Sequence, residues 1–241
     1  MYKFFLTLAF AAVALSGTAK AAPIVIDNFG EPASVSGAEF HAVDDGLLPI
    51  NDLGLLTTNV VGGSRVGSVQ SFLGSPTLGD SVTLTYGSGF GSHFTVATAG
   101  TGTTDVNLMY DANGAGLALD LSSQVGIMLD FSILDAAAIG TTFTLDITDV
   151  TATTFSETLT ATTGGPQTFD FLFSLPGYAG LDTSTIDTIE LNSSVPSNVD
   201  IRISNIQSIE NVPEPGSLAI WGLIGIAGAF GFWRMRRKVG R

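Results

Sequence analysis

Carboxylates are the residues of this chain that are most able to do chemistry. The sequence has 22 Asp and Glu residues against nine Lys and Arg, two histidines and no cysteine. Paired carboxylates could act in glycoside hydrolysis or bind a hard cation such as Ca²⁺. The absence of cysteine excludes thiolate metal sites and thiol redox chemistry. Because no spacing selects one carboxylate pair, a glycan-active enzyme is the least favoured function.

Other candidate sites are incomplete. Segment 111–114 (Asp-Ala-Asn-Gly) looks like the beginning of a calcium loop, but the further oxygen ligands and the late Glu are missing, so a turn is favoured. His41 and His93 have no metal-ligand spacing, and we expect surface or turn histidines. The glycine-rich segment 87–92 lacks the lysine of a phosphate-binding loop. No Gly-x-Ser-x-Gly serine-hydrolase elbow occurs in the chain.

The positive charge lies at the two ends of the chain. Residues 22–215 contain two basic and 22 acidic residues, which gives a net charge of −20. Such a body repels nucleic acid and anionic headgroups, and cations are the partner class that it favours. We expect its two cations, Arg65 and Arg202, each to pair with an acid near a strand end. For Arg65, which follows Gly62 and Gly63, a buried bidentate carboxylate pair is predicted.

Residues 1–21 have the layout of a secretory signal peptide. Lys3 precedes an apolar stretch at 4–15, and small residues lead to Ala19-Lys-Ala21, an Ala-x-Ala cleavage site. The apolar stretch is too short for a bilayer core of roughly 30 Å. We therefore expect export by the Sec machinery and cleavage after Ala21.

The C-terminal segment 212–241 combines three features that are typical of a targeting segment. Val212-Pro213-Glu214-Pro215 is extended and poor in hydrogen-bond donors, which suits a protease site. An uncharged apolar run at 217–233 has about the minimum length for one transmembrane helix. The basic tail at 234–241 is expected to stay in the cytoplasm, so the body between the two ends lies outside.

The body, residues 22–211, has the length of one domain, and its sequence predicts many short strands. Several segments alternate between apolar and polar residues, and turns rich in Gly, Asn and Pro separate them. Only 136–139 could form a helical turn. The pattern predicts an all-β sandwich or barrel. The expected strands are 23–29, 57–61, 64–69, 81–86, 93–97, 104–110, 125–131, 142–148, 155–160, 168–173, 188–192 and 199–204.

The order of these segments resembles the jelly-roll body common in exported PEP-CTERM proteins, which is similar to galactose-binding-like sandwiches. The resemblance rests on Ile26-Asp-Asn-Phe29, Gly62-Gly-Ser-Arg65, the strands at 126–131 and 169–171, and the closing strand Asp200–Ile206. Pro213-Glu214-Pro215, the span and the basic tail are similar to the sorting signal of this family. The resemblance implies a jelly-roll β-sandwich and cleavage by an exosortase-type enzyme. It also implies a membrane-anchored precursor at the inner membrane and a mature form at the cell surface or outside the cell.

The resemblance also suggests ligands for the body. In related sandwiches a structural calcium bridges the first and last strands, and Asp27 and Asp200 lie on the matching segments here, with Glu31 or Asp44 near them. No other cofactor is implied. Carbohydrate binding needs aromatic platforms or convergent polar groups. Both tryptophans lie in the C-terminal span, which leaves three tyrosines in the body, at positions 86, 110 and 178.

The leading hypothesis is a non-enzymatic surface or extracellular-matrix protein, exported alongside exopolysaccharide and processed by an exosortase. The alternative is a carbohydrate- or calcium-binding module of the same fold. Both hypotheses exclude nucleic acid as a partner, and both place the precursor in the membrane through its C-terminal helix.

Overall fold

The alternation of apolar and polar residues produces the strands of the body. In β8 (Thr142–Asp149) the side chains of Phe143, Leu145 and Ile147 are buried, and the residues between them face outward. In β10 (Gln167–Leu172) Phe169 and Phe171 are buried in the same way. Successive side chains of a strand point to opposite faces, so each of these strands presents one apolar face to a core.

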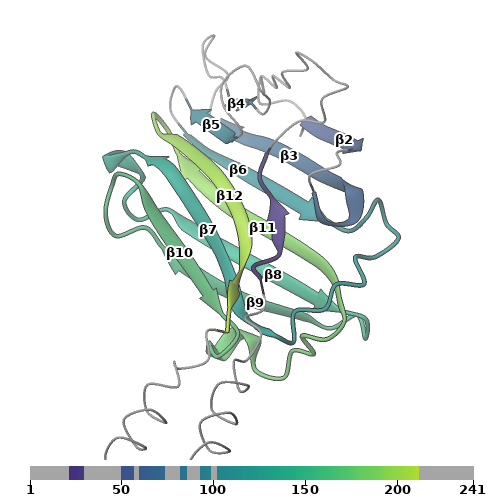
Figure 1. Cartoon of the computed structure of the whole chain (residues 1–241). Helices are drawn as coiled ribbons and strands as arrows, with labels where there is room; N and C mark the ends of the chain where they lie inside the picture. Colours follow the sequence, from purple (N-terminus) through teal and green to yellow (C-terminus); the bar gives the residue numbers. More distant parts are fainter. Residues whose placement is uncertain are drawn as a thin grey trace, which may run out of the picture. The chain divides into compact units, whose positions relative to one another are not determined.

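The computed structural model describes residues 22–29, 50–56, 60–73, 82–85, 93–98 and 102–211. The described strands form two antiparallel sheets (Figure 1). The first sheet has the order β10-β7-β12-β5-β4, with β1 also paired to β12, and the second has the order β2-β3-β6-β11-β8-β9. Besides β8 and β10, the strands are β1 (Val25–Asp27), β2 (Ile50–Leu56), β3 (Ser64–Leu73), β4 (Val82–Thr85), β5 (Phe94–Thr98), β6 (Gly102–Tyr110), β7 (Gln124–Leu134), β9 (Thr154–Thr160), β11 (Ile186–Pro196) and β12 (Asp200–Glu210).

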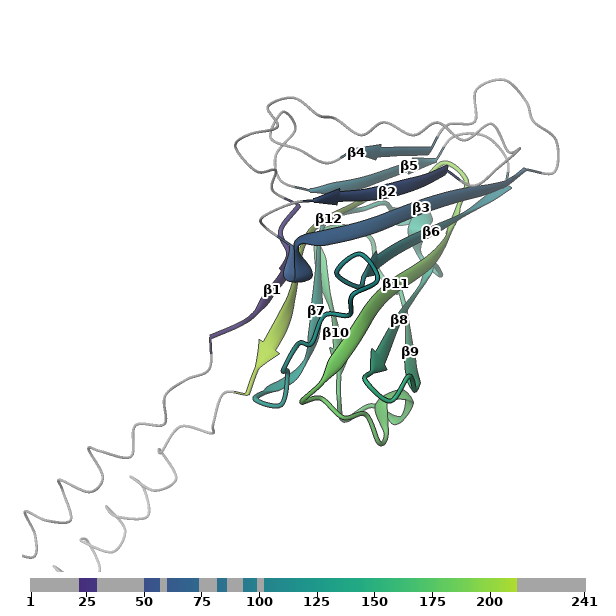
Figure 2. The same cartoon turned by 90° about the vertical axis from the view of Figure 1, so that its right-hand side faces the viewer.

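The chain passes repeatedly from one sheet to the other. From β5 onward, β5, β7, β10 and β12 lie in the first sheet, whereas β6, β8, β9 and β11 lie in the second. Figure 2 shows the two layers from the side. This wrapping of antiparallel strands around a shared core makes the fold a jelly-roll β-sandwich, as the sequence predicts. The short helical turns at Val61–Gly63, Ala136–Ala138 and Pro176–Tyr178 are 3₁₀ turns.

Three phenylalanines join the sheets at the centre of the core. Phe131 and Phe169 come from the first sheet and Phe143 from the second. Their ring centroids lie 4.8 to 5.2 Å apart with tilted or edge-on geometry. Aromatic pairs at these separations add to the stabilisation from burial.

The observed strands differ from the expected ones where alternation is interrupted. The sequence predicts a strand at 57–61, but Val61 begins a 3₁₀ turn and the strand lies earlier, at Ile50–Leu56. The register of β2 against β3 shifts between Asp52 and Leu55, so its apolar residues do not keep a period of two. β11 and β12 are longer than expected because they continue through polar residues that resemble turns.

Several predicted features lie outside the described residues. They are the signal peptide with Ala19 and Ala21, the motif Val212–Pro215, the span at 217–233, His41, Tyr86 and the segment 87–92. Glu31 and Asp44 are also outside them. Within the part of the chain that the structure describes, no helix is long and apolar enough to cross a bilayer.

A tightly packed glycine in β7 gives a first test of this fold. A Cβ on Gly126 would lie 2.5 Å from the carbonyl oxygen of Phe171 and 2.9 Å from the Cα of Leu172, both backbone atoms of the neighbouring strand β10. We expect Gly126→Ala to lower the free energy of unfolding by about 1–3 kcal/mol, because β10 must shift. Urea unfolding of the exported protein measures this. Thr168→Ser on the exposed face of β10 is the control, and equal stability of both variants would contradict the packing of β7 against β10.

Candidate functional site

A buried ion pair joins the two sheets at the first strand. Asp27 comes from β1 in the first sheet, and Arg65 comes from β3 in the second. Arg65 Nη1 lies 2.7 Å from Asp27 Oδ2, and the two residues are 1% and 0% exposed. The Arg65 guanidinium also lies over the Phe29 ring, 5.4 Å from its centroid. The prediction that Arg65 forms a buried pair with a carboxylate is therefore confirmed, with Asp27 as the partner, through the contact from Nη1 to Oδ2. The bidentate geometry stays a prediction.

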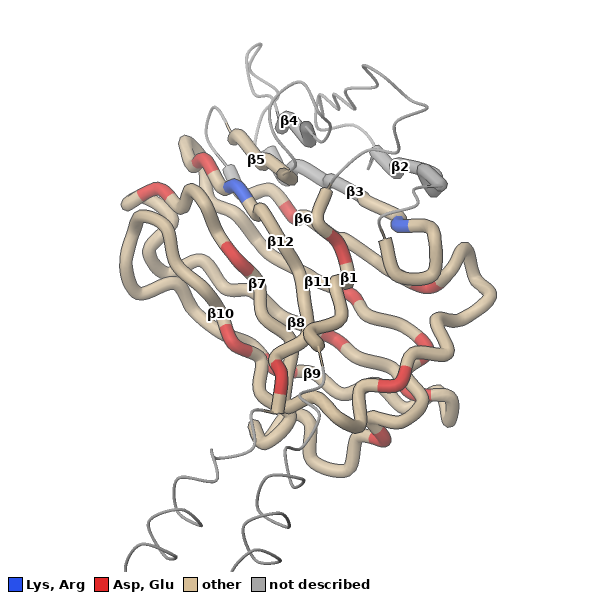
Figure 3. Tube along the Cα trace, in the orientation of Figure 1, with Lys and Arg blue, Asp and Glu red and all other residues tan. Residues whose placement is uncertain are grey.

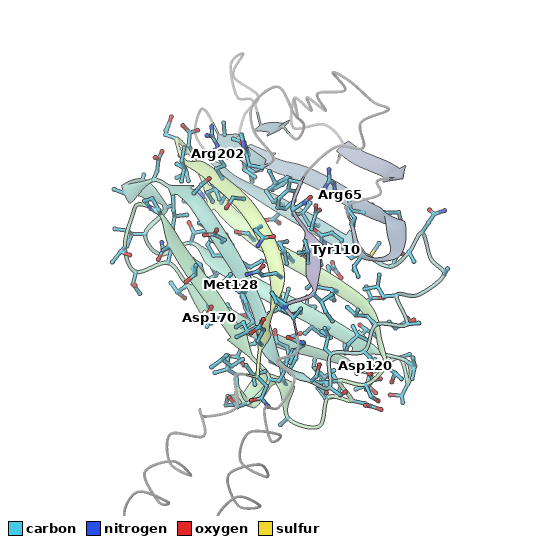
Figure 4. The ribbon with its side chains drawn as sticks, in the orientation of Figure 1. Arg65, Tyr110, Asp120, Met128, Asp170 and Arg202 are labelled. Carbon is cyan, nitrogen blue, oxygen red and sulfur yellow. The ribbon has the colours of Figure 1, made fainter. Side chains whose placement is uncertain are left out.

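Two further donors complete the surroundings of Asp27. The backbone N–H of Phe29 donates to Oδ1 at 2.7 Å, and the Tyr110 hydroxyl donates to Oδ2 at 3.1 Å. Burial raises the pKa of the Asp27 carboxyl above its usual value, although Arg65 and these donors lower it. Burial and the neighbouring Asp27 raise the pKa of Tyr110 well above its usual value, so its hydroxyl stays a donor. Figure 4 shows Tyr110 and Arg65 on the same side of the sandwich.

Two glycines bring the chain into position for Arg65. Gly62 and Gly63 have φ angles of 73° and 76°, in the left-handed region that favours glycine. A Cβ on Gly62 would also approach Leu117 Cδ2 to 2.6 Å. The Gly-Gly step therefore allows the sharp turn from Val60, which forms an isolated bridge with Asp27, into β3.

The two residues predicted to bind calcium are not brought together. Asp27 is the register partner of Ile206 on β12, whereas Asp200 begins that strand. Six residues of strand separate the two positions by roughly 20 Å, far beyond the span of one calcium site. Asp200 is exposed, and its backbone N–H donates to Asp135 Oδ2 at 3.0 Å. Among the described residues, no group of three or more His, Cys, Asp or Glu side chains could hold a metal ion.

Two expectations about isolated polar residues are wrong. His93, expected on the surface or in a turn, is buried just before β5, and burial, with the charge of Arg202, lowers its pKa.

Arg202 was expected to pair with an acid, but the described residues provide no ion-pair partner within 4 Å for it. Figure 4 shows Arg202 near the beginning of β12, away from Arg65 and Tyr110.

The tyrosines of the described body belong to the core. Tyr110 and Tyr178 are 0% and 2% exposed, and the Tyr178 hydroxyl donates to the Leu145 carbonyl at 2.9 Å. Neither ring can stack on a sugar at the surface. A tyrosine-lined sugar site, which the sequence left open, is therefore not formed by these two residues.

The outer surface of the second sheet presents an array of polar side chains, which we call the polar face. β6, β11, β8 and β9 are consecutive neighbours in this sheet, and their outward positions come into register (Figure 3 shows the acidic positions along the trace). The polar face consists of Asn107 on β6, Glu190 and Asn192 on β11, Thr144 and Asp146 on β8, and Ser156 and Thr158 on β9.

Hydrogen bonds connect these side chains across four strands. The Asn107 amide donates to Glu190 Oε1 and, at 2.7 Å, to Asn192 Oδ1. The Asn192 amide donates to Asp146 Oδ2 at 2.9 Å, and the Ser156 hydroxyl donates to Asp146 Oδ1. The network therefore fixes the orientation of the side chains that it connects.

Sequence reasoning did not find the polar face. Its residues are the polar members of alternating strands, and every exposed strand has such positions. Only the register shows that Glu190 and Asp146 lie directly opposite each other on β11 and β8. One sequence signal could have indicated the polar face. The outward positions of these strands hold carboxylates and amides as well as hydroxyl groups.

The C-terminal segment matches a known sorting signal. Residues 211–238 carry the PEP-CTERM protein-sorting motif. The match includes the Pro213-Glu214-Pro215 motif, the apolar run and most of the basic tail, as the sequence predicts. A PEP-CTERM signal implies an exported precursor that an exosortase sorts to the surface.

The β-sandwich is similar in fold to solved carbohydrate-binding modules, and no curated protein matches the chain. A family 11 carbohydrate-binding module of a cellulosomal cellulase from Clostridium thermocellum is 13% identical, with coverage of 80% of this chain and 96% of that one and a TM-score of 0.38. A family 29 module in complex with mannohexaose is 10% identical, with coverage of 79% and 92% and a TM-score of 0.33. An exo-β-agarase is 14% identical, with coverage of 80% and 25% and a TM-score of 0.37. At these values the similarities support no statement about ligand or activity.

Removing Asp27 tests the role of the buried pair. We expect Asp27→Leu to lower the free energy of unfolding by about 3–5 kcal/mol, because the Arg65 charge stays buried without its carboxylate. The double variant Asp27→Leu/Arg65→Met should recover much of this loss, since both charges are replaced by apolar groups. Urea unfolding of the exported protein measures both effects.

Asp120→Asn, at an exposed carboxylate, is the control and should change stability by less than about 0.5 kcal/mol. Equal stability of Asp27→Leu and wild type would show that the pair does not hold β1 in place.

Proposed function

We propose that this chain is a non-enzymatic surface or matrix protein, sorted by an exosortase and displayed together with exopolysaccharide. The observation that carries the proposal is the PEP-CTERM sorting motif at residues 211–238. The signal peptide predicted at 1–21 supplies the export step that such sorting requires. The apolar run at 217–233 supplies the temporary membrane anchor.

The composition of the body supports display in a hydrated matrix. Removal of both ends leaves a β-sandwich with a net charge close to −20 and no tryptophan. A high net charge of one sign keeps a protein soluble and prevents association with anionic surfaces. We therefore propose that the body has no membrane affinity of its own once the C-terminal anchor is removed.

The buried chemistry of the body supports a non-enzymatic role. Asp27, Arg65 and Tyr110 form a cluster of ionisable side chains in contact, but each is at most 1% exposed. A catalytic group must reach its substrate within hydrogen-bond distance. This cluster is sealed from solvent, so it stabilises the fold and is not available to a substrate.

A carbohydrate-binding module is the second candidate, and the polar face favours it. Its amide and carboxylate groups converge on one side of the second sheet, as polar groups do in binding sites. Calcium binding by Asp27 and Asp200 remains a prediction from resemblance, and the strand register gives it no support.

Changing the prolines of the motif tests the sorting step. We expect Pro213→Ala/Pro215→Ala to accumulate as a membrane-bound precursor, because the extended segment recognised by the protease is lost. Immunoblots of membrane, surface and medium fractions from the producing cells measure its distribution. A drop of at least tenfold in released or surface-attached protein is expected.

Pro166→Ala, in an exposed turn before β10, is the matched control and should be sorted like wild type. Normal processing of the double proline variant, or of wild type in cells without the exosortase gene, would contradict the proposal.

A further inference from the structure

We infer that the turn Pro176–Tyr178 closes the free edge of strand β9 and thereby prevents β9 from pairing with β9 of a second copy of this chain. We call this turn the edge guard. Its action concerns self-association of the body and is independent of the proposed sorting. Three features carry it: the backbone groups that β9 leaves unpaired, the contact of the turn with that edge, and the charges of the edge strands.

Strand β9 is the outer strand of the second sheet, and among the described strands it pairs with β8 alone. At the two ends of this pair, the Ala161 N–H donates to the Thr141 carbonyl and the Asp149 N–H donates to the Thr153 carbonyl. Because hydrogen-bonded and non-hydrogen-bonded pairs alternate along an antiparallel ladder, the odd-numbered residues of β9 bond to β8. The even-numbered residues therefore direct their N–H and C=O groups to the free edge. They are Thr154, Ser156, Thr158 and Thr160.

This edge is suited to pairing with another strand. A row of unpaired N–H and C=O groups is a template for a further chain, and the part of the chain that the structure describes provides no backbone hydrogen bond to these four residues. Three of them are threonine, which is common in strands. Their exposed side chains carry no charge, so two copies of β9 could lie antiparallel without bringing like charges together on the outer face.

The edge guard lies directly against the middle of this edge. A Cβ on Gly177 would overlap the Ser156 carbonyl oxygen, so glycine is needed for the two backbones to approach so closely. The Gly177 N–H donates to Glu157 Oε2 at 2.8 Å. A partner strand would have to displace Gly177 to reach Ser156, and the stretches of edge on either side are shorter than an ordinary strand.

Contacts with both sheets hold the edge guard in place. The Tyr178 side chain is buried, and its hydroxyl donates to the Leu145 carbonyl of β8 at 2.9 Å. Its ring meets the ring of Phe173, which directly follows β10, in an edge-on contact with 6.0 Å between the centroids. Pro176 fixes φ at the beginning of the turn. The turn is therefore held against β9 from two sides.

Glu157 adds a charge that opposes pairing. Its position alternates with the outward-facing residues of β9, and its neighbours on the same face, Phe155 and Leu159, pack against the core. Its side chain therefore points to the inner side of the strand. Natural proteins use inward-pointing charges on edge strands to prevent edge-to-edge association. A second β9 placed antiparallel around this residue would bring two carboxylates together.

The edge strand of the first sheet carries its protection on the outer face. The Phe173 N–H donates to the Val125 carbonyl, so by the same alternation Thr168 and Asp170 direct their backbone groups to the free edge of β10. Asp170 is an exposed carboxylate of this strand (Figure 4). Two copies of β10 would therefore bring like charges together on the outer face. The edge guard lies at the edge that lacks such an outer charge.

Single-cysteine cross-linking of the exported protein tests the inference, because the chain has no cysteine of its own. Thr158→Cys places the reporter at the free edge of β9, where oxidation joins two copies whose edges pair. With the edge guard intact, we expect this variant to stay monomeric. Adding Gly177→Ala pushes the turn away from Ser156 and should raise the cross-linked fraction at least tenfold.

Two controls separate edge pairing from other effects. Ala179→Ser also adds one atom to the loop, but at an exposed position, and it should leave the protein monomeric. Thr168→Cys combined with Gly177→Ala reports the free edge of β10 and gives the background from random collisions. Thermal unfolding within a few degrees of the parent shows that the variants are folded. If Gly177→Ala fails this criterion, Glu157→Thr takes its place, since it removes the inward charge and suits a strand.

A proline at the edge should reverse the effect. Thr158→Pro removes an N–H that points to the free edge and not to β8, so β9 can keep its pairing with β8. Added to Gly177→Ala, it should restore the monomer, as measured by size-exclusion chromatography with light scattering.

Three results would overturn the inference. Thr158→Cys could cross-link as fully with the edge guard intact as without it. Gly177→Ala and Glu157→Thr could both remain monomeric at high protein concentration. Association of Gly177→Ala that Thr158→Pro does not reduce would place the interface elsewhere on the body. None of these results bears on processing of the C-terminal motif, so the two proposals are tested separately.

Discussion

The buried contact between Asp27 and Arg65 is the interaction on which the rest of the body depends. It joins the first strand to the opposite sheet, and Tyr110 and Phe29 surround it. A charge so far from water is tolerated only with a partner, so β1 has essentially one place to dock. Once docked, β1 pairs with β12, and the Ile24 N–H donates to Ser208 Oγ at 2.7 Å. The first and last strands of the body therefore lie side by side, as Figure 2 shows.

The described body begins just before β1 and ends just after β12, so its two ends lie on paired strands. Its polar residues fall into two separate sets: the buried cluster of Asp27, Arg65 and Tyr110 joins the two sheets, and the hydrogen-bonded network lies on the outer surface of the second sheet. Because the two sets share no residue, changes in one should leave the other intact.

Much of the fold could be predicted from the sequence, because the alternation of apolar and polar residues along a strand indicates which side chains are buried. Phe143, Leu145 and Ile147 occupy the inner face of β8 as their spacing indicates. The prediction failed where this rule is interrupted, as in the irregular strand β2, and at His93, which is buried although it lies outside a strand. The C-terminal motif could be recognised in the sequence because its three parts, the Pro-Glu-Pro motif, the apolar run and the basic tail, follow one another directly.

The candidate binding surface could not be predicted, since its residues are far apart in sequence. Asn107, Asp146 and Glu190 become neighbours only through the register of three strands. The partner of Arg65 was hidden for the same reason, although its Gly-Gly approach signalled a special position. The C-terminal motif can therefore be recognised from the sequence, whereas the polar face can be recognised only from the strand register.

The intact mass of the native exported protein tests the central claim most directly. The account predicts a product that begins at Ala22 and ends close to Pro215, without the apolar run and without Arg241, in cells that contain the exosortase. A native product that extends to Arg241 in those cells would contradict it.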